Sequence, residues 1–164
     1  MNTSRDRLLD ILNKHGAELY ALLTRLTMRA DVADDLLQEL FLKLRAAKGF
    51  AAAANQKGYA LRSAIHLAFD WRKAQRPVEQ LRTEPASASR SPLDHLIDAD
   101  ELEQVLDAMQ HLSELSRQAL VLRYLQHQEY GDIAAQLRKS EHQVRGLCHK
   151  GITVLRSMLR STAQ

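Results

Sequence analysis

Apolar residues recur every three or four positions through the first half of the chain, the spacing of one face of an α-helix. The first two sets are Leu8, Leu12, Leu19, Leu22 and Leu26, followed by Leu36, Leu37, Leu40, Phe41 and Leu44. A third set, between Asn55 and about Arg76, consists of Ala60, Ala64, Ile65, Ala68 and Phe69. This pattern predicts three helices that pack together through these faces.

The second half repeats this spacing and ends in a recognisable motif. Leu102, Val105, Leu106 and Met109 predict a helix from about Glu101 to His111, and another is predicted from about Ser116 to Leu125. The last segment reads YGDIAAQL, RKS and EHQVRGLCHKGITVLRSML: a short helix, a three-residue turn and a longer helix. This is the spacing of a helix-turn-helix, which places its second helix in the major groove of DNA.

The start of that second helix carries its own signal. Ser140 is a suitable N-cap, and Gln143 three residues later would complete a capping box. The first turns could then present Glu141, His142, Arg145 and His149 to a groove. An ordinary helical hairpin with a polar outer face would show the same pattern.

The chain loses helical periodicity for long only between Pro77 and Pro92, a stretch that holds all three prolines. Such a stretch is typical of an interdomain linker. We therefore predict an all-α protein of two small helical domains, residues 1–76 and 101–164, joined by a flexible linker at 77–100.

Composition supports this fold and narrows the class of protein. The chain has 164 residues, with 28 Leu and 22 Ala against 17 Val, Ile and Thr together, a balance that favours helices over strands. One cysteine, Cys148, excludes an internal disulfide. No apolar run approaches the ~20 residues of a membrane span, and the N-terminus lacks a signal-peptide pattern. We therefore expect a cytoplasmic protein without membrane insertion.

The net charge of +3 hides a division along the chain. Residues 1–82 hold 14 basic against 9 acidic residues, residues 83–111 hold 1 against 7, and residues 112–164 hold 8 against 4. Two basic lobes thus flank an acidic connector. Basic lobes suit a polyanion such as nucleic acid, although many basic surfaces are only solvated.

The predicted second helix has an acidic side. Asp31, Asp34, Asp35, Gln38 and Glu39 share one side of residues 31–44, opposite the apolar positions. Paired carboxylates could bind a metal, but no Glu-x-x-His pair or second acidic cluster accompanies them. A protein-binding face is the better specific interpretation, and a solvated face is the ordinary alternative.

Three segments together resemble the sigma factors of bacterial RNA polymerase, in the small extracytoplasmic-function (ECF) group. DDLLQELFLKL at 34–44 resembles the core-binding segment of region 2, D-L-x-Q-E-x-F-L-x-L. AIHLAFDWRK at 64–73 resembles the following segment, which grips the downstream promoter element. Residues 112–117, 130–137 and 144–156 resemble region 4. The segments occur in the family's order, with the linker where the family has one.

The resemblance implies residue roles. Binding to the β′ clamp helices of core polymerase falls to Asp34, Asp35, Leu36, Gln38, Glu39 and Phe41. Binding of the downstream promoter element falls to Arg62, His66, Asp70, Arg72, Lys73 and Arg76. Binding of the upstream element falls to Ser140, Glu141, His142, Arg145, Gly146, His149 and Lys150. Region 4 would also dock on the β flap, and an anti-sigma factor is a further partner to consider.

The resemblance also marks departures from the family. Arg138 stands where the family usually has the turn glycine before the recognition helix, so we expect Arg138 to adopt a positive φ. His66 replaces the usual Asn, and Gly146 replaces a frequent Ser or Thr. Promoter preference is therefore not transferable from typical members.

Other classes of function receive less support. No Gly-rich phosphate loop, nucleophile elbow or catalytic triad is present, so we expect no enzyme, no cofactor, no metal site and no small-molecule substrate. A stand-alone helix-turn-helix regulator, with an N-terminal dimerisation or ligand domain, is the main alternative to a signal-responsive sigma factor. An all-helical adaptor that binds only protein is the third, and it would not bind DNA in a salt-sensitive manner.

Overall fold

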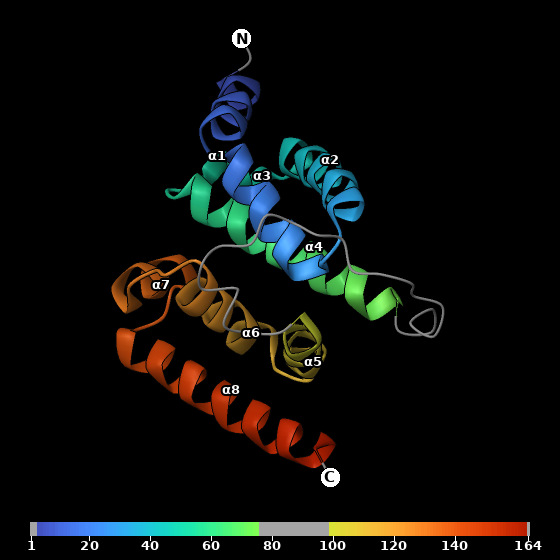
Figure 1. The fold of residues 1–164 in the computed structure, drawn as a ribbon. Coiled ribbons are helices and arrows are strands. Elements are labelled where there is room, and N and C mark those ends of the chain that lie inside the picture. Colours follow the sequence, from blue (N-terminus) through green and yellow to red (C-terminus); the bar gives the residue numbers. More distant parts are fainter. Residues whose placement is uncertain (1–2, 76–98, 164) are drawn as a thin grey trace. The chain divides into compact units, whose positions relative to one another are not determined.

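The computed structural model describes residues 3–75 and 99–163, and every regular element within these ranges is helical. The first range forms α1 (Thr3–Thr27), α2 (Ala30–Ala46), α3 (Lys48–Ala52) and α4 (Gln56–Gln75) (Figure 1). The second forms α5 (Ala99–Met109), α6 (Glu114–Leu120), a π-helical turn η3 (Val121–Leu125), α7 (Tyr130–Leu137) and α8 (Glu141–Thr162). The prediction of an all-α protein is confirmed.

The chain divides into two compact units, residues 1–88 and 89–164. The predicted linker from Pro77 to Pro92 lies outside the described residues. The bounds 1–76, 77–100 and 101–164 stay a prediction, although α5 already begins at Ala99.

The N-terminal unit is built on three long helices, because α1, α2 and α4 all pack against one another. The predicted apolar faces supply most of its core, although Leu12, Leu37 and Phe41 are only half-buried. The buried leucines of the first two helices are Leu8, Leu19, Leu22, Leu23, Leu26, Leu36, Leu40 and Leu44. The sequence pattern missed α3, since five residues are too few to show a helical period. Phe50 anchors this short helix, and its ring meets the Tyr59 ring edge-on at a centroid distance of 5.9 Å.

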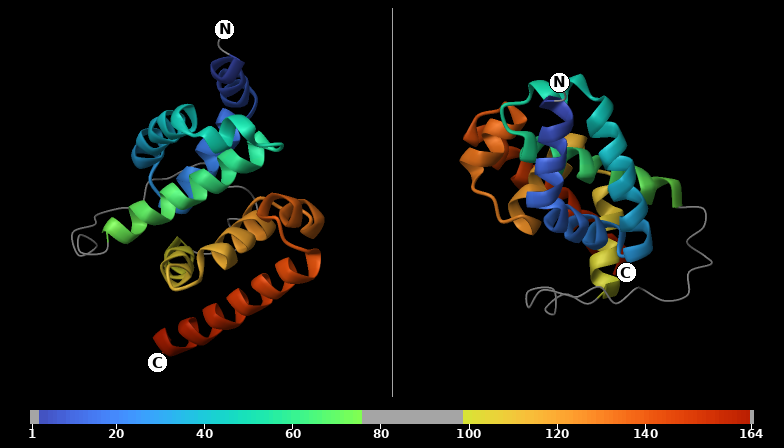
Figure 2. Two further views of the ribbon diagram at one scale, coloured as in Figure 1. Left: turned by 180° about the vertical axis from the view of Figure 1, so that it is seen from behind. Right: turned by 90° about the horizontal axis from the view of Figure 1, so that it is seen from above.

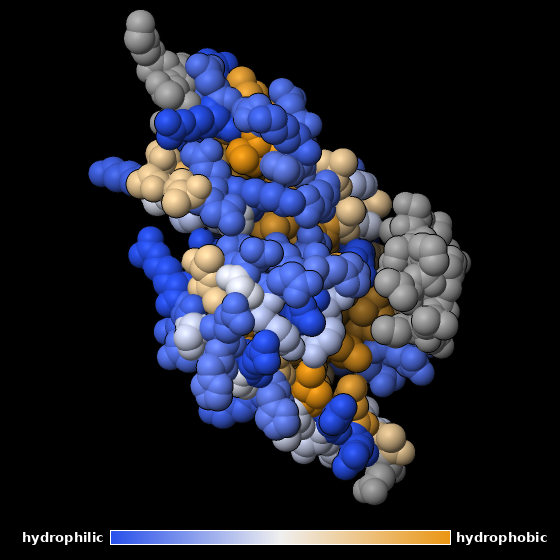
Figure 3. Space-filling view, turned by 90° about the vertical axis from the view of Figure 1, so that its left-hand side faces the viewer, coloured by the Kyte–Doolittle hydropathy of each residue, from blue (hydrophilic) through white to orange (hydrophobic). Residues whose placement is uncertain are grey.

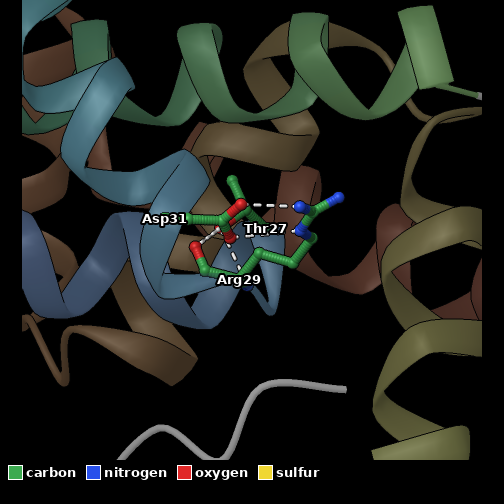
Figure 4. A network of polar contacts seen from close by, with 3 residues as sticks. All are labelled: Thr27, Arg29 and Asp31. Carbon is green, nitrogen blue, oxygen red and sulfur yellow. Dashed lines mark hydrogen bonds and ion pairs between the residues drawn. The ribbon is translucent and has the colours of Figure 1, made fainter. Parts of the chain in front are cut away.

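A tight polar connection joins α1 to α2 (Figure 4). Met28 adopts a positive φ of 60°, and the Arg29 backbone N–H donates to Thr27 Oγ1 at 3.3 Å. The Arg29 guanidinium donates to both carboxylate oxygens of Asp31, at 3.2 and 2.6 Å. These hydrogen bonds hold the pKa of the Asp31 carboxyl below its usual value. The connection fixes the direction in which α2 leaves α1.

The C-terminal unit is built on α8, which packs against α5, α6 and α7. In both Figure 1 and Figure 2, α7 lies beside the N-terminal part of α8 and α5 lies beside its C-terminal part. The helix predicted from Ser116 begins earlier, because Ser113 Oγ caps it by accepting from the Ser116 N–H at 3.2 Å. Its last part is the π turn η3, closed by the Gln126 N–H donating to the Val121 carbonyl at 3.0 Å.

The helix-turn-helix forms as the sequence predicts. Arg138 ends α7 in the left-handed region, with φ 55° and ψ 46°, as expected where glycine usually stands. Ser140 and Gln143 form the expected capping box, with hydrogen bonds of 3.1 and 2.9 Å. Because α8 starts at a fixed residue, the phase of its outward side chains is also fixed.

Candidate polymerase and nucleic-acid interfaces

The acidic face of α2 is exposed. The side chains of Asp34, Asp35, Gln38 and Glu39 all reach solvent, while Leu36, Leu40 and Leu44 on the opposite side are buried. Lys43 Nζ lies 3.8 Å from Glu39 Oε1 in an exposed pair, which contributes little free energy in water. The face can therefore offer its carboxylates to a basic partner surface.

Two of the residues implied for this face are less exposed than its polar members. Leu36 is only 6% exposed, because its side chain packs into the core of the N-terminal unit. Phe41 is half-buried and has limited surface to offer. The implied contact role of Leu36 is corrected accordingly: it supports the helix from within.

The outward face of α4 is only partly basic. His66 and Lys73 are exposed and Arg62 is half-buried, with its guanidinium 5.7 Å from the centre of the Tyr59 ring. His66 Nε2 lies 3.1 Å from Asp70 Oδ2, and both side chains are about half exposed. The implied set thus contains a His–carboxylate pair beside its cations.

The implied DNA-binding role of Arg72 conflicts with its position. Arg72 is only 4% exposed, and its Nη1 donates to the Leu26 carbonyl in the last turn of α1 at 3.2 Å. A cation at a helix C-terminus is favourable because it faces the negative end of the helix dipole. Arg72 therefore ties α4 to α1 and does not face DNA. Arg76 lies outside the described residues.

The outward face of α8 contains the full implied set. All seven residues implied for this face, counting the N-cap Ser140, are exposed: Ser140, Glu141, His142, Arg145, Gly146, His149 and Lys150. Only three residues of this helix, Val144, Cys148 and Gly151, are buried. Burial raises the pKa of the Cys148 thiol, as expected of a core residue. A helix buried on one narrow side leaves a broad face for a groove.

An aromatic side chain that the sequence pattern did not single out contacts this face. The guanidinium of Arg145 lies 5.0 Å from the centre of the Tyr130 ring, and that of Arg123 lies 4.2 Å from the same centre. Tyr130 begins α7, and an aromatic residue at the start of a helix-turn-helix was the available signal. Its pairing with Arg145 depends on how α7 crosses α8, which periodicity does not give.

Apolar surface and metal ligands give no competing site. Large apolar side chains are exposed singly on five elements, at Leu9, Leu42, Leu115, Tyr124 and Val154. The face in Figure 3 is mostly hydrophilic, with small separate hydrophobic areas. Across 3–75 and 99–163, no group of three or more His, Cys, Asp or Glu residues could hold a metal ion. Scattered apolar residues of this kind are normal on a folded surface.

Family models match both units in order. Residues 11–78 match the model for Sigma-70 region 2, and residues 102–152 match that for Sigma-70, region 4. The chain belongs to the sigma-70 family of RNA polymerase sigma factors. Because region 2 occupies the N-terminal unit, that unit is not the dimerisation or ligand domain of a stand-alone regulator.

Curated proteins that are similar in sequence to this chain include ECF sigma factors. The ECF RNA polymerase sigma factor SigX of Bacillus subtilis (strain 168) is 26% identical over 155 residues, covering 89% of this chain and 80% of the relative. The ECF RNA polymerase sigma factor SigK of Mycobacterium sp. (strain JLS) is 23% identical over 164 residues, covering 91% and 81%.

Solved structures share the fold. RpoE of Bartonella quintana, in complex with the anti-sigma factor NepR, matches with a TM-score of 0.51 and 20% identity over 98% of both chains. CnrH, in complex with the cytosolic domain of CnrY, matches with a TM-score of 0.54 and 18% identity over 97% of this chain and 91% of that one.

The family assignment sets the class of activity. A sigma factor binds RNA polymerase and directs initiation at promoters, and this chain acts in transcription initiation as a member of that class. Within the described ranges, no helix is long and apolar enough to cross a membrane.

Proposed function

We propose that this sigma factor divides its work among three helices, in the cytoplasm. The acidic face of α2, defined as Asp34, Asp35, Gln38 and Glu39, binds the basic surface of the polymerase β′ clamp helices. The outward face of α4 holds separated promoter DNA. The outward face of α8 reads the upstream element, and region 4 docks on the β flap.

The observation that carries the proposal is the exposure of all four side chains of the acidic face on a helix that buries Ala33, Leu36, Leu40 and Leu44 on its other side. Such a face has no structural task of its own. Carboxylates and an amide at this spacing can form charge-assisted hydrogen bonds with basic side chains and fix the register of a docked helix.

For DNA, the proposal keeps the exposed residues and leaves out the buried one. Arg62, His66, Asp70 and Lys73 form the α4 face, without Arg72. Ser140, Glu141, His142, Arg145, Gly146, His149 and Lys150 form the α8 face, and their uniform exposure supports the assignment. One structural relative, RpoE of Bartonella quintana, was solved in complex with an anti-sigma factor, so we include a partner of that class.

Charge reversal on the acidic face tests the proposal. Asp35→Arg and Glu39→Arg should each lower affinity for core polymerase about 100-fold or more, because a like charge across a complementary interface costs several kcal/mol. Affinity is measured by competition with the unmodified protein for core polymerase, followed by transcription from a promoter library.

The matched control is Asp10→Arg, the same charge change at an exposed position of α1. It should leave core affinity nearly unchanged. Equal effects at Asp10 and Asp35 would show a dependence on net charge alone, and unchanged affinity in both α2 variants would remove the acidic face from the interface.

A further inference from the structure

Tyr130 holds two cationic side chains that come from different elements. Its ring centre lies 5.0 Å from the Arg145 guanidinium carbon of α8 and 4.2 Å from that of Arg123 in η3. Both distances are within the range of a cation–π interaction. Neither Tyr130 nor Arg123 is among the residues for which the resemblance implies a role, although Tyr130 begins the segment 130–137 that resembles region 4.

Arg123 of η3 holds the Tyr130 ring on one side. Arg123 is tied to the following loop, since its Nη1 donates to the Gln128 carbonyl at 3.0 Å and lies 3.7 Å from Glu129 Oε2. The ring is therefore held on the side of η3, and π turns of this kind often occur at functional sites.

The first two turns of α8 lie against the first turn of α7. A Cβ atom on Gly131 would be 3.0 Å from Glu141 Oε1, so the Glu141 carboxylate passes close over the residue next to Tyr130. Arg145, one turn after Glu141, is exposed yet rests on the Tyr130 ring. The Arg145 guanidinium is therefore supported by the Tyr130 ring within the fold itself.

An exposed arginine normally loses rotamer freedom when it binds a base edge, and that loss weakens binding. A side chain already resting on a ring has lost part of this freedom on folding. The planar guanidinium presents its hydrogen-bond donors in a rigid fork that suits a bidentate contact. Orientation by the ring would therefore favour one base over others.

We propose that Tyr130 is a positioning residue for Arg145 and helps to set which base of the upstream promoter element Arg145 selects. The inference rests on the proposed function, in which Arg145 contacts DNA. It adds that the aromatic ring, and not the tyrosine hydroxyl, performs the positioning.

The test uses holoenzyme, made from core polymerase and the full chain, on promoters randomised in the upstream element. Arg145→Ala should reduce the preference at one base position about 5- to 150-fold. Tyr130→Leu, which keeps apolar volume without a ring, should reduce the preference at the same position about 2- to 5-fold. Tyr130→Phe, which keeps the ring and loses the hydroxyl, should retain it.

A double variant separates positioning from general support of the fold. In the Arg145→Ala background, Tyr130→Leu should cause no further change in base preference. A uniform loss on all sequences in Tyr130→Leu, an additive loss in the double variant, or a loss in Tyr130→Phe equal to that in Tyr130→Leu would overturn the inference. If Tyr130→Leu impairs folding, the contrast between Tyr130→Phe and unmodified protein still decides whether the hydroxyl is responsible.

The two proposals fail differently. If Arg145→Ala leaves base preference unchanged, the assignment of Arg145 to DNA is wrong and the inference falls with it. If Arg145→Ala changes the preference and Tyr130→Leu does not, the assignment stands and only the positioning role is overturned.

Discussion

Helices α4 and α8 have similar lengths, 20 and 22 residues, and both carry residues assigned to DNA, yet they bury very different shares of their surface. Nine residues of α4 are buried, including the charged Arg72, whereas α8 buries three. The reason is packing: α4 lies against α1, α2 and α3, while α8 meets its neighbours along one side. A polar residue on a central helix can therefore serve the fold even when its spacing suggests an outer face.

The comparison separates two arginines that the sequence pattern treats alike. Arg72 bonds the Leu26 carbonyl inside the N-terminal unit, and Arg145 rests on an aromatic ring at the surface of the other unit. Removing each should therefore change a different property, stability in the first case and base preference in the second.

The largest expected effect is on the stability of the N-terminal unit. Arg72→Ala should lower its free energy of unfolding by roughly 1.5 to 3 kcal/mol, because a buried hydrogen bond to a charged group is lost. Urea unfolding followed by the fluorescence of Trp71, the single tryptophan, reports this unit directly. Lys73→Ala, at the exposed neighbouring position, is the control and should change stability by less than about 0.5 kcal/mol. Equal losses in the free energy of unfolding for Arg72→Ala and Lys73→Ala would contradict the structural role of Arg72.

Next comes the contrast between two cations on α8. Arg145→Ala should cost about 1 to 3 kcal/mol on the preferred upstream element and relax the choice at one base. Lys150→Ala should weaken all sequences alike and reduce the salt dependence by about one charge, as a phosphate contact does. Holoenzyme binding to a promoter library at several salt concentrations measures both. The reverse pattern would mean that the helix is rotated differently in the groove.

Two glycines of α8 sharpen the contrast between its buried and exposed sides. A Cβ on Gly151 would lie 2.7 Å from Leu120 Cδ1, whereas one on Gly146 would meet nothing within 4 Å. Ala at either position gains ~1 kcal/mol in helix propensity, but at Gly151 crowding should cost about 1 to 3 kcal/mol. Thermal unfolding should therefore rank Gly146→Ala above unmodified protein and Gly151→Ala below Gly146→Ala. Equal stability of the two variants would contradict the close packing of α8 on α6.

The smallest expected effect is on promoter opening. Lys73→Ala should leave core binding intact and reduce open-complex formation about 2- to 5-fold, because a single exposed charge pair contributes at most ~1 kcal/mol. Permanganate reactivity of promoter thymines measures the opened bases. Normal reactivity would place this position in solvent and leave α4 with a structural role only.

Local signals in the sequence determined much of this protein. Helical periodicity gave the long helices and their apolar faces, because a helix that packs on one side must repeat its apolar residues every three or four positions. The N-cap at Ser140 and the left-handed turn at Arg138 also follow from neighbouring residues alone. For the same reason the residues that the resemblance implies for the DNA-facing side of α8 are all exposed, because a helix packed along one narrow side keeps its phase.

The tertiary structure alone decided the rest. Arg72 is polar and lies near the basic face in sequence, but its burial depends on the end of α1, 46 positions away. Tyr130 and Arg145 meet only because α7 crosses the start of α8. Contacts between distant segments depend on the angles at which helices pack, and side-chain volumes across the whole core set those angles. Local periodicity carries no record of them.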